Sequence, residues 1–196
     1  MSAILKPTYT FEEYLARERI TAEKCEFYHG QIFAMAGGSP RHNTIGVNLV
    51  ASLRGRLRGS PCRPFNSDQR IRIPENGLAT YPDVSVVCGE LQLDGADRDA
   101  VTNPRVIFEV LSKSTESYDR GKKFDLYRQL VSFQEYILVV QDEPQVERYV
   151  RQEDGSWLLT VFKGMETMLE LQTLATGLPF SEIYEDVRFG HEGDGE

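Results

Sequence analysis

The spacing of apolar and polar residues predicts three main helices. Thr10–Glu13 has the spacing of a capping box and predicts a short helix that runs to about Glu18. Ser39-Pro40 combines an N-cap with proline at the first helical position, and the amphipathic pattern that follows can end at Gly59. Ser117–Leu130 has a third helical pattern.

Apolar runs between these helices predict strands. Asp83–Cys88 and Arg105–Leu111 are near-continuous apolar runs, which are typical of strands covered on both faces. Val146–Val150 and Trp157–Phe162, joined across Asp154-Gly155, predict an exposed hairpin. Shorter strand patterns occur at 25–28, 31–35, 70–73 and 136–140, and a final helical turn at 181–184.

This order of elements predicts an α/β fold with a mixed central β-sheet flanked by α-helices. The length of 196 residues suits a single domain over 1–190, with 191–196 as a flexible tail. Residues 90–103 are acidic and contain glycine, so we expect a mobile loop there. Residues 1–5 are too short for a signal peptide, and no apolar run approaches the roughly 18 residues of a membrane span.

The cysteines favour a reducing compartment. Cys25, Cys62 and Cys88 are odd in number, widely spaced and without a CxxC pair. We therefore expect three thiols, no zinc site and no disulfide, in a cytoplasmic protein.

Positive charge is concentrated in one segment of an acidic chain. The net charge is −8, yet residues 41–72 contain seven arginines, no lysine and one acid. Such a segment can bind a polyanion by one face, because phosphate contacts need local potential rather than net charge. The alternative is a solvated helix face with an edge strand of outward arginines. The candidate nucleic-acid contacts are Arg41, Arg54, Arg58, Arg70 and Arg72.

Two acids in the buried-type strands are candidates for chemistry. Asp83 follows Pro82 at the start of its strand, and Glu109 lies inside an apolar strand, where a lone carboxylate is costly unless it is paired or bound to a metal. The structural alternative for Glu109 is a salt bridge to a core arginine. Two carboxylates from adjacent strands suit Mg²⁺, which keeps water ligands for a phosphate substrate.

A nearby cation would complete such a site, and the spacing leaves three lysines open. Lys113 follows the strand of Glu109, whereas Lys122 and Lys123 lie on the next helix. Asp119 and Tyr127 are each one helical turn from Lys123, a spacing that fits a surface ion pair and a core tyrosine equally well.

These residues resemble a known family. The motifs are Pro82-Asp83, then Glu109-Val110-Leu111-Ser112 with Ser114-Thr115, then Asp119, Lys123 and Tyr127, with Glu26, Gly30, Ser39-Pro40-Arg41-His42 and Glu135-Tyr136 as further matches. Together they look like the Uma-type family of restriction-endonuclease-like proteins, which belongs to the PD-(D/E)xK nuclease superfamily. The likeness extends from about residue 8 to about residue 187.

The resemblance implies a restriction-endonuclease-like core with an added C-terminal β-hairpin. It implies that Asp83 and Glu109 bind Mg²⁺, with Mn²⁺ as an alternative ion, and that Lys123 is the catalytic lysine. Glu26 would be an additional acid near the metal, and His42 a helper facing the cleft. The chain departs from the family pattern at His29, usually aspartate, and at Lys113, usually proline; the latter leaves open which lysine faces the metal.

The expected function is a metal-dependent endonuclease that hydrolyses phosphodiester bonds, with DNA as the expected substrate. Two alternatives stay open: a non-catalytic nucleic-acid or protein-binding module that kept the fold, and an enzyme acting on another phosphate ester. We expect a homodimer, the commonest oligomer, with the 146–162 hairpin as its contact.

Overall fold

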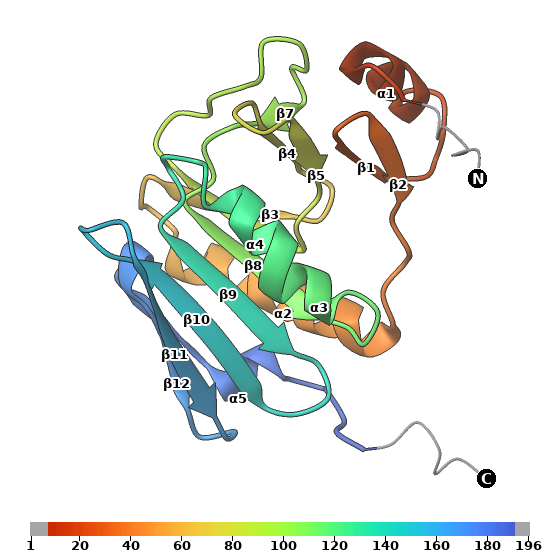
Figure 1. The fold of residues 1–196 in the computed structure, drawn as a ribbon. Helices are drawn as coiled ribbons and strands as arrows, with labels where there is room; N and C mark the ends of the chain where they lie inside the picture. Colours follow the sequence, from red (N-terminus) through yellow and green to blue (C-terminus); the bar gives the residue numbers. More distant parts are fainter. Residues whose placement is uncertain (1–7, 191–196) are drawn as a thin grey trace, which may run out of the picture.

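A six-stranded mixed sheet forms the centre of the structure, a computed structural model that describes residues 8–190 (Figure 1). The strands lie in the order β11-β10-β9-β8-β6-β3, with β8 and β9 parallel and the other neighbours antiparallel. Their bounds are β3 Cys62–Asn66, β6 Val84–Cys88, β8 Val106–Leu111, β9 Glu135–Val140, β10 Gln145–Arg151 and β11 Trp157–Lys163. The predicted mixed α/β architecture is confirmed.

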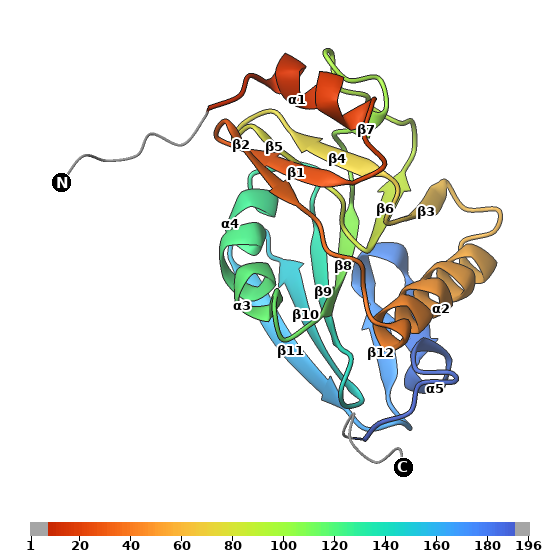
Figure 2. The same cartoon turned by 90° about the vertical axis from the view of Figure 1, so that its right-hand side faces the viewer.

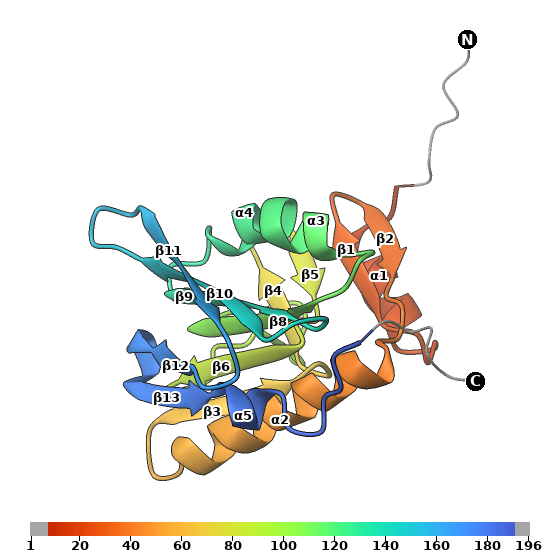
Figure 3. The same cartoon turned by 90° about the horizontal axis from the view of Figure 1, so that it is seen from below.

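The structure has five α-helices within residues 8–190, and four of them, α2 to α5, cover the two faces of this sheet. Their bounds are α1 Phe11–Glu18, α2 Pro40–Arg56, α3 Glu116–Tyr118, α4 Phe124–Tyr127 and α5 Phe180–Ile183. Seen from below, α2 and α5 lie on one side of the sheet, and α3 and α4 lie on the other (Figure 3). Within residues 8–190, no helix is long and apolar enough to cross a membrane.

The alternation of side chains along β8 explains this layering. Val106, Phe108 and Val110 belong to the apolar cluster that includes α2 and α5, whereas Ile107 and Leu111 belong to the cluster that includes α4. Because successive side chains of a strand point to opposite faces, a continuous apolar run is what a doubly covered strand requires. Glu109 therefore points to the α4 side.

A second sheet covers one end of the first, together with α1 (Figure 2). Its order is β2-β1-β5-β4-β7, with bounds β1 Cys25–Tyr28, β2 Gln31–Ala34, β4 Arg70–Ile73, β5 Leu78–Thr80 and β7 Ala100–Val101. The predicted capping box of α1 is present, since Thr10 and Glu13 each accept a bond from the other's backbone N–H. The β1–β2 turn uses His29 and Gly30, both with positive φ, which suits a two-residue hairpin.

The 117–130 pattern forms a helix that is interrupted by a π-helix. Between α3 and α4, Asp119–Lys123 (η1) adopts π geometry. This geometry is rare in proteins, and where it occurs it is often at a functional site. The wider turn changes the direction in which Asp119 and Lys123 point, and both are buried.

The C-terminal hairpin extends the central sheet at one edge. β10 pairs with β9 along its length, and Val146 is fully buried. The prediction of an exposed hairpin is wrong for β10, because β9 pairs with it along one edge and Val146 packs into the core cluster that also contains residues of α2 and α5. A further small sheet, β12 Met168–Leu171 and β13 Thr176–Pro179, joined by a 3-10 turn (η2, Gln172–Leu174), was not predicted.

Two other predictions were wrong. The 90–103 segment is held in place: Asp97 is buried and paired with Arg70, and β7 pairs with β4.

Cys62 and Cys88 form a disulfide, because β3 and β6 pair with these two residues directly opposite each other. Cys25 stays a thiol, and it is buried. Sequence separation alone does not reveal which strands pair.

The second sheet and α1 are joined by a buried ionic network around Arg70. Its guanidinium pairs with Glu18 of α1, with Asp97 of the ordered loop and with the hydroxyl of Tyr81. Glu18 and Asp97 side chains are only 6% and 3% exposed. Removing one partner of such a network leaves buried charges without compensation.

We expect Arg70→Met to lower the free energy of unfolding by about 3–5 kcal/mol, because Glu18 and Asp97 lose their cation. Urea denaturation measures this effect. The control is Arg128→Met, which breaks the exposed pair with Asp125 and should cost less than about 1 kcal/mol. Equal effects of the two substitutions would contradict the role of the network.

Candidate functional site

The two predicted acids lie opposite each other on adjacent strands. β6 and β8 pair antiparallel with Val84 opposite Phe108, so extending this register by one residue places Asp83 opposite Glu109. Directly opposite residues of antiparallel strands have neighbouring side chains on one face. The backbone N–H of Asp83 lies 3.4 Å from Glu109 Oε2, and the N–H of Val110 donates to Asp83 Oδ2 at 2.7 Å.

Glu109 is buried and bonded to two residues of the interrupted helix. Its side chain is 4% exposed, and Oε1 pairs with Lys123 Nζ at 2.8 Å and accepts from the Tyr127 hydroxyl at 2.9 Å. The partner is thus a lysine, and not the core arginine of the structural alternative. Tyr127 is both a buried core side chain and a hydrogen-bond donor to the Glu109 carboxylate.

Of the three candidate lysines, Lys123 is the one in contact with Glu109. Its Nζ also lies 3.4 Å from Asp119 Oδ1, and its side chain is 7% exposed. Lys122 instead lies over the Tyr28 ring, 5.2 Å from its centroid, and Lys113 lines a separate surface hollow with Glu116 and Arg120. The π turn places Lys123 and Asp119 on the buried side.

Glu26 lies on the second sheet, on the side of the site formed by the interrupted helix. Its Oε2 accepts from Thr80 Oγ1 at 2.7 Å, and its Oε1 accepts from the Tyr118 hydroxyl. The Glu26 carboxylate also contributes to raising the pKa of Lys123. A third carboxylate therefore acts on this lysine, in addition to those of Glu109 and Asp119.

His42, in the first turn of α2, contacts Asp83 from the opposite side. Its Nε2 lies 3.2 Å from Asp83 Oδ2. Burial lowers the pKa of His42, but the hydrogen bond and charge of Asp83, with the charge of Glu109, outweigh it, so the pKa lies above its ordinary value. Ser39 caps α2 by accepting from the His42 N–H, which fixes the start of the helix.

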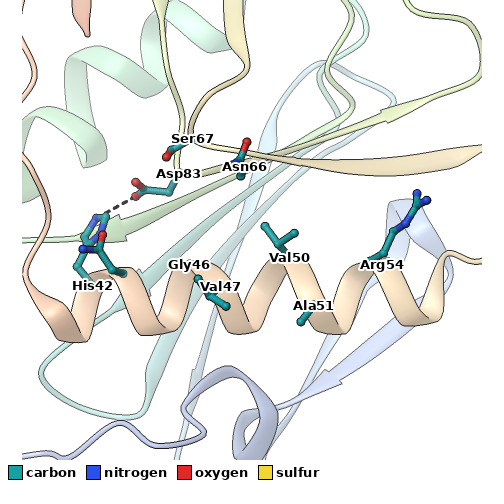
Figure 4. Close-up of a pocket in the computed structure, with 10 residues that line it drawn as sticks. His42, Gly46, Val47, Val50, Ala51, Arg54, Asn66, Ser67 and Asp83 are labelled. Carbon is teal, nitrogen blue, oxygen red and sulfur yellow. Dashed lines mark ion pairs between the residues drawn. The ribbon is translucent and has the colours of Figure 1, made fainter. Parts of the chain in front are cut away.

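A groove of about 520 Å³ leads away from this contact along α2 (Figure 4). His42 and Asp83 lie at one end of it, joined by their ion pair, and Arg54 lies toward the other end. Its lining residues are His42, Asn43, Gly46, Val47, Val50, Ala51, Arg54, Asn66, Ser67 and Asp83. The helix side of the groove is mostly small and apolar, so the polar groups are concentrated near Asp83, at the β3–β4 turn and at Arg54.

The structure does not bring the predicted arginines together on one surface. Arg54 lines the groove and Arg58 is exposed beyond it, whereas Arg41 is paired with Asp142. Arg70 is occupied by its buried network, and Arg72 lies over the Phe11 ring and donates to a backbone carbonyl. Of these five arginines, only Arg54 lines the groove that begins at Asp83.

The acids offer two free oxygens for a cation. Within the described chain, Asp83 Oδ1 accepts no hydrogen bond, and Glu109 Oε2 has only the 3.4 Å contact with the Asp83 N–H. No group of three or more His, Cys, Asp and Glu side chains in residues 8–190 is arranged to hold a metal ion. The oxygens of Asp83 and Glu109 are hard donors, the type that Mg²⁺ takes from one or two carboxylates while it keeps water ligands.

Burial determines the protonation of the central ion pair. Desolvation raises the pKa of Glu109 to about 8, even though Lys123 opposes it. Burial also lowers the pKa of Lys123, but the carboxylates of Glu109 and Asp119 outweigh it and hold this pKa well above its ordinary value. Lys123 is therefore protonated at neutral pH.

Four residues around the site were not predicted. Thr80 and Tyr118 hold Glu26, and Asn66 and Ser67 form the wall of the groove opposite α2. Thr80 and Tyr118 are close in sequence to Asp83 and Asp119, but a polar residue beside a strand or in a helix is too common to single them out.

Comparison with known proteins gives a consistent result. The family model described as "Uma2: Putative restriction endonuclease" matches residues 11–181. Two proteins of Synechocystis sp. (strain PCC 6803) are similar. "Uncharacterized protein slr1290" is 38% identical over 186 residues, which cover 93% of this chain and 95% of that protein. "Uncharacterized protein sll1609" is 39% identical over 161 residues, which cover 82% and 91%.

A solved structure has the same fold. It is the crystal structure of a protein from Anabaena variabilis, described as a putative nuclease belonging to DUF820. The TM-score is 0.69 at 18% sequence identity, and the match covers 88% of this chain and 95% of that one. The central sheet and its helices are therefore shared with a nuclease-like fold.

The raised pKa of Glu109 predicts a pH-dependent stability in metal-free buffer. Between the unfolded pKa near 4.5 and the folded pKa of about 8, the folded chain holds a proton that the unfolded chain has lost. This contribution to stability is complete below the unfolded pKa and is lost as the pH rises through about 8.

Urea denaturation with EDTA from about pH 5 to pH 8 measures this dependence. The free energy of unfolding of the unmodified chain should fall relative to that of Glu109→Gln, which lacks the titrating group. Glu116→Gln, at an exposed position, serves as the control and should follow the unmodified chain. A constant difference between the unmodified chain and Glu109→Gln across this pH range would contradict the assignment.

Proposed function

Because the chain belongs to the Uma2 family, described as "Putative restriction endonuclease", we propose that it is a metal-dependent endonuclease that hydrolyses phosphodiester bonds in DNA. The observation that carries the proposal is the contact of Asp83, Glu109 and Lys123 in one site. A module that only binds nucleic acid has no use for a desolvated carboxylate in its central strand. We further propose that this set is the PD-(D/E)xK constellation of the chain.

Asp83 and Glu109 would hold a divalent cation, Mg²⁺ or Mn²⁺, through the two oxygens that no strong hydrogen bond occupies. When bound, the ion supplies positive charge against the phosphate and makes water more acidic. The Val110 N–H and His42 fix the Asp83 carboxylate, and the Tyr127 hydroxyl fixes that of Glu109. Both acids are thus oriented before any ligand arrives.

Lys123 contributes positive charge where negative charge develops during attack on the phosphate. Its high pKa keeps it protonated, and Asp119 is a second carboxylate beside it, with Oδ1 3.4 Å from Nζ. Glu26 adds negative charge near Lys123 and would help to position it. His42 lies at the end of the groove with its Nε2 3.2 Å from Asp83 Oδ2, so it would help to position the Asp83 carboxylate toward a phosphate bound there.

The groove beside α2 is the proposed path of the DNA backbone from the acids. Arg54 lies about three helical turns from His42, and Arg58 lies in the turn just after α2, so both can reach phosphates away from the reacting one. Arg41, Arg70 and Arg72 have internal partners, and we do not assign them to DNA.

Asp83→Asn and Glu109→Gln should each reduce metal-dependent cleavage of plasmid and single-stranded DNA by about 10³-fold or more, because each removes a charge that holds the cation. Gel assays with Mg²⁺ or Mn²⁺ measure the rates. The matched control is Asp125→Asn, an exposed acid on the same helical segment. Thermal unfolding must show that the inactive variants are folded.

Three results separate this function from its alternatives. Cleavage that survives both substitutions would refute the site. DNA binding without cleavage by the unmodified chain would favour a binding module. Hydrolysis of small phosphate esters without cleavage of DNA would favour a different substrate.

Arg54→Ala should weaken DNA binding and reduce the slope of log affinity against log salt by about 0.9, the value for one lost phosphate contact. Fluorescence anisotropy at several salt concentrations measures this slope. Arg128→Ala, an exposed arginine paired with Asp125, should leave it unchanged. An unchanged slope for Arg54→Ala would remove the groove from the DNA path.

A further inference from the structure

The two edges of the central sheet differ in how they are protected. β3 forms one edge, and it carries Arg63 and Pro64, two residue types that prevent further strand pairing. β11 forms the other edge at the outer side of the sheet (Figure 1). From Trp157 to Phe162 it has no charged residue, no proline and no glycine. Within residues 8–190, β10 is the only strand that pairs with β11.

This unprotected edge is also apolar at its surface. Leu158, Leu159 and Val161 are 55%, 45% and 46% exposed. Met165 and Met168, in the turn after β11 and at the start of β12, are exposed as well. A long apolar edge strand with free backbone N–H and C=O groups is a template for pairing with another strand.

We propose that β11 pairs antiparallel with β11 of a second copy of this chain, about a two-fold axis at Thr160, to form a homodimer. In this register Leu159 lies opposite the partner's Val161, and Leu158 lies opposite the partner's Phe162. Leucine, valine and phenylalanine thus lie opposite one another on both sides of Thr160, which lies opposite its own copy at the axis. A two-fold contact uses the same surface on both copies and closes, so it does not extend into a fibre.

The charges at the two ends of the strand favour the antiparallel arrangement. Lys163 ends β11, and Glu153 and Asp154 lie in the turn that precedes it. Antiparallel pairing brings the lysine of one copy toward the acidic turn of the other. Parallel pairing would place like charges side by side. This complementarity makes a second copy the best-matched occupant of the edge.

Both faces of the joined sheet would be continuous. The Trp157 ring packs against Phe124 on the α4 side, so Leu159 and Val161 also lie on that side. Phe162 belongs to the cluster on the α2 side, beside Arg148, so Leu158 and Thr160 lie there. The pairing therefore extends each apolar layer into that of the partner, and it does not depend on the nuclease site.

Light scattering coupled to gel filtration tests the assembly. The unmodified chain should have twice the 22.3 kDa mass of one chain. Leu159→Lys and Val161→Glu should each raise the dimer dissociation constant at least about tenfold, since each places an unpaired charge against apolar residues. Val131→Glu, at an exposed apolar residue outside the sheet, is the control and should stay dimeric.

Two further measurements test the register. Each detects the formation of a dimer, which a misfolded variant would not produce. Mixing Leu159→Lys with Val161→Glu should restore dimers, because the introduced charges lie opposite each other. Oxidised Thr160→Cys should give a covalent dimer, whereas Ser156→Cys should not. A monomeric unmodified chain, or a dimer that survives both charge substitutions, would overturn the proposal. A dimer with no Thr160→Cys cross-link would overturn the register.

Discussion

The burial of Glu109 in a strand covered on both faces is the constraint on which the site depends. A carboxylate in that position must be compensated, and the compensation comes from Lys123 and Tyr127, both supplied by one helical segment. Asp119 and Lys123 are the first and last residues of the π turn between α3 and α4, and both are buried. The backbone irregularity therefore lies in the segment that supplies the cation of the buried pair.

The two faces of the central sheet differ in the side chains that β8 contributes to them. On the α2 side, apolar side chains of α2, α5, β12 and β13 form a continuous core without a buried acid of β8. On the α4 side, the same strand has Glu109 in place of an apolar residue, and aromatic residues of α4 and β9 surround the charged group. The first face mainly supplies stability, so the second can carry a group that costs stability. This division is common where a strand ends at a functional site.

The acids face two different surroundings. Glu109 is enclosed and depends on protein partners, whereas Asp83 is 19% exposed and opens to the groove along α2. The two acids therefore extend from the buried interior, at Glu109, to the groove along α2, at Asp83. The N-terminus of α2 reaches Asp83 through His42, and this contact links the groove to the two acids. The edge strand β11 lies at the end of the sheet away from β6, beside which Asp83 lies.

The sequence by itself determined the mixed α/β class, most elements and the two acids. Continuous apolar runs identify doubly covered strands, and an acid inside one of them has no local explanation, so Glu109 stood out without a structure. The resemblance selected Lys123, and the spacing alone could not, because an ordinary helix does not show which of two neighbouring lysines turns inward. The motifs were therefore sufficient to identify the family.

Only the tertiary structure decided the pairings between distant segments. The β3–β6 register joins Cys62 to Cys88, and Arg70 is occupied by acids 52 and 27 residues away in sequence. The sequence therefore predicted a single basic surface for the 41–72 segment, whereas in the structure its arginines contact different partners. Local patterns report propensity and burial, which depend on near neighbours. Register and ion pairing depend on which strands meet, and that is a property of the whole fold.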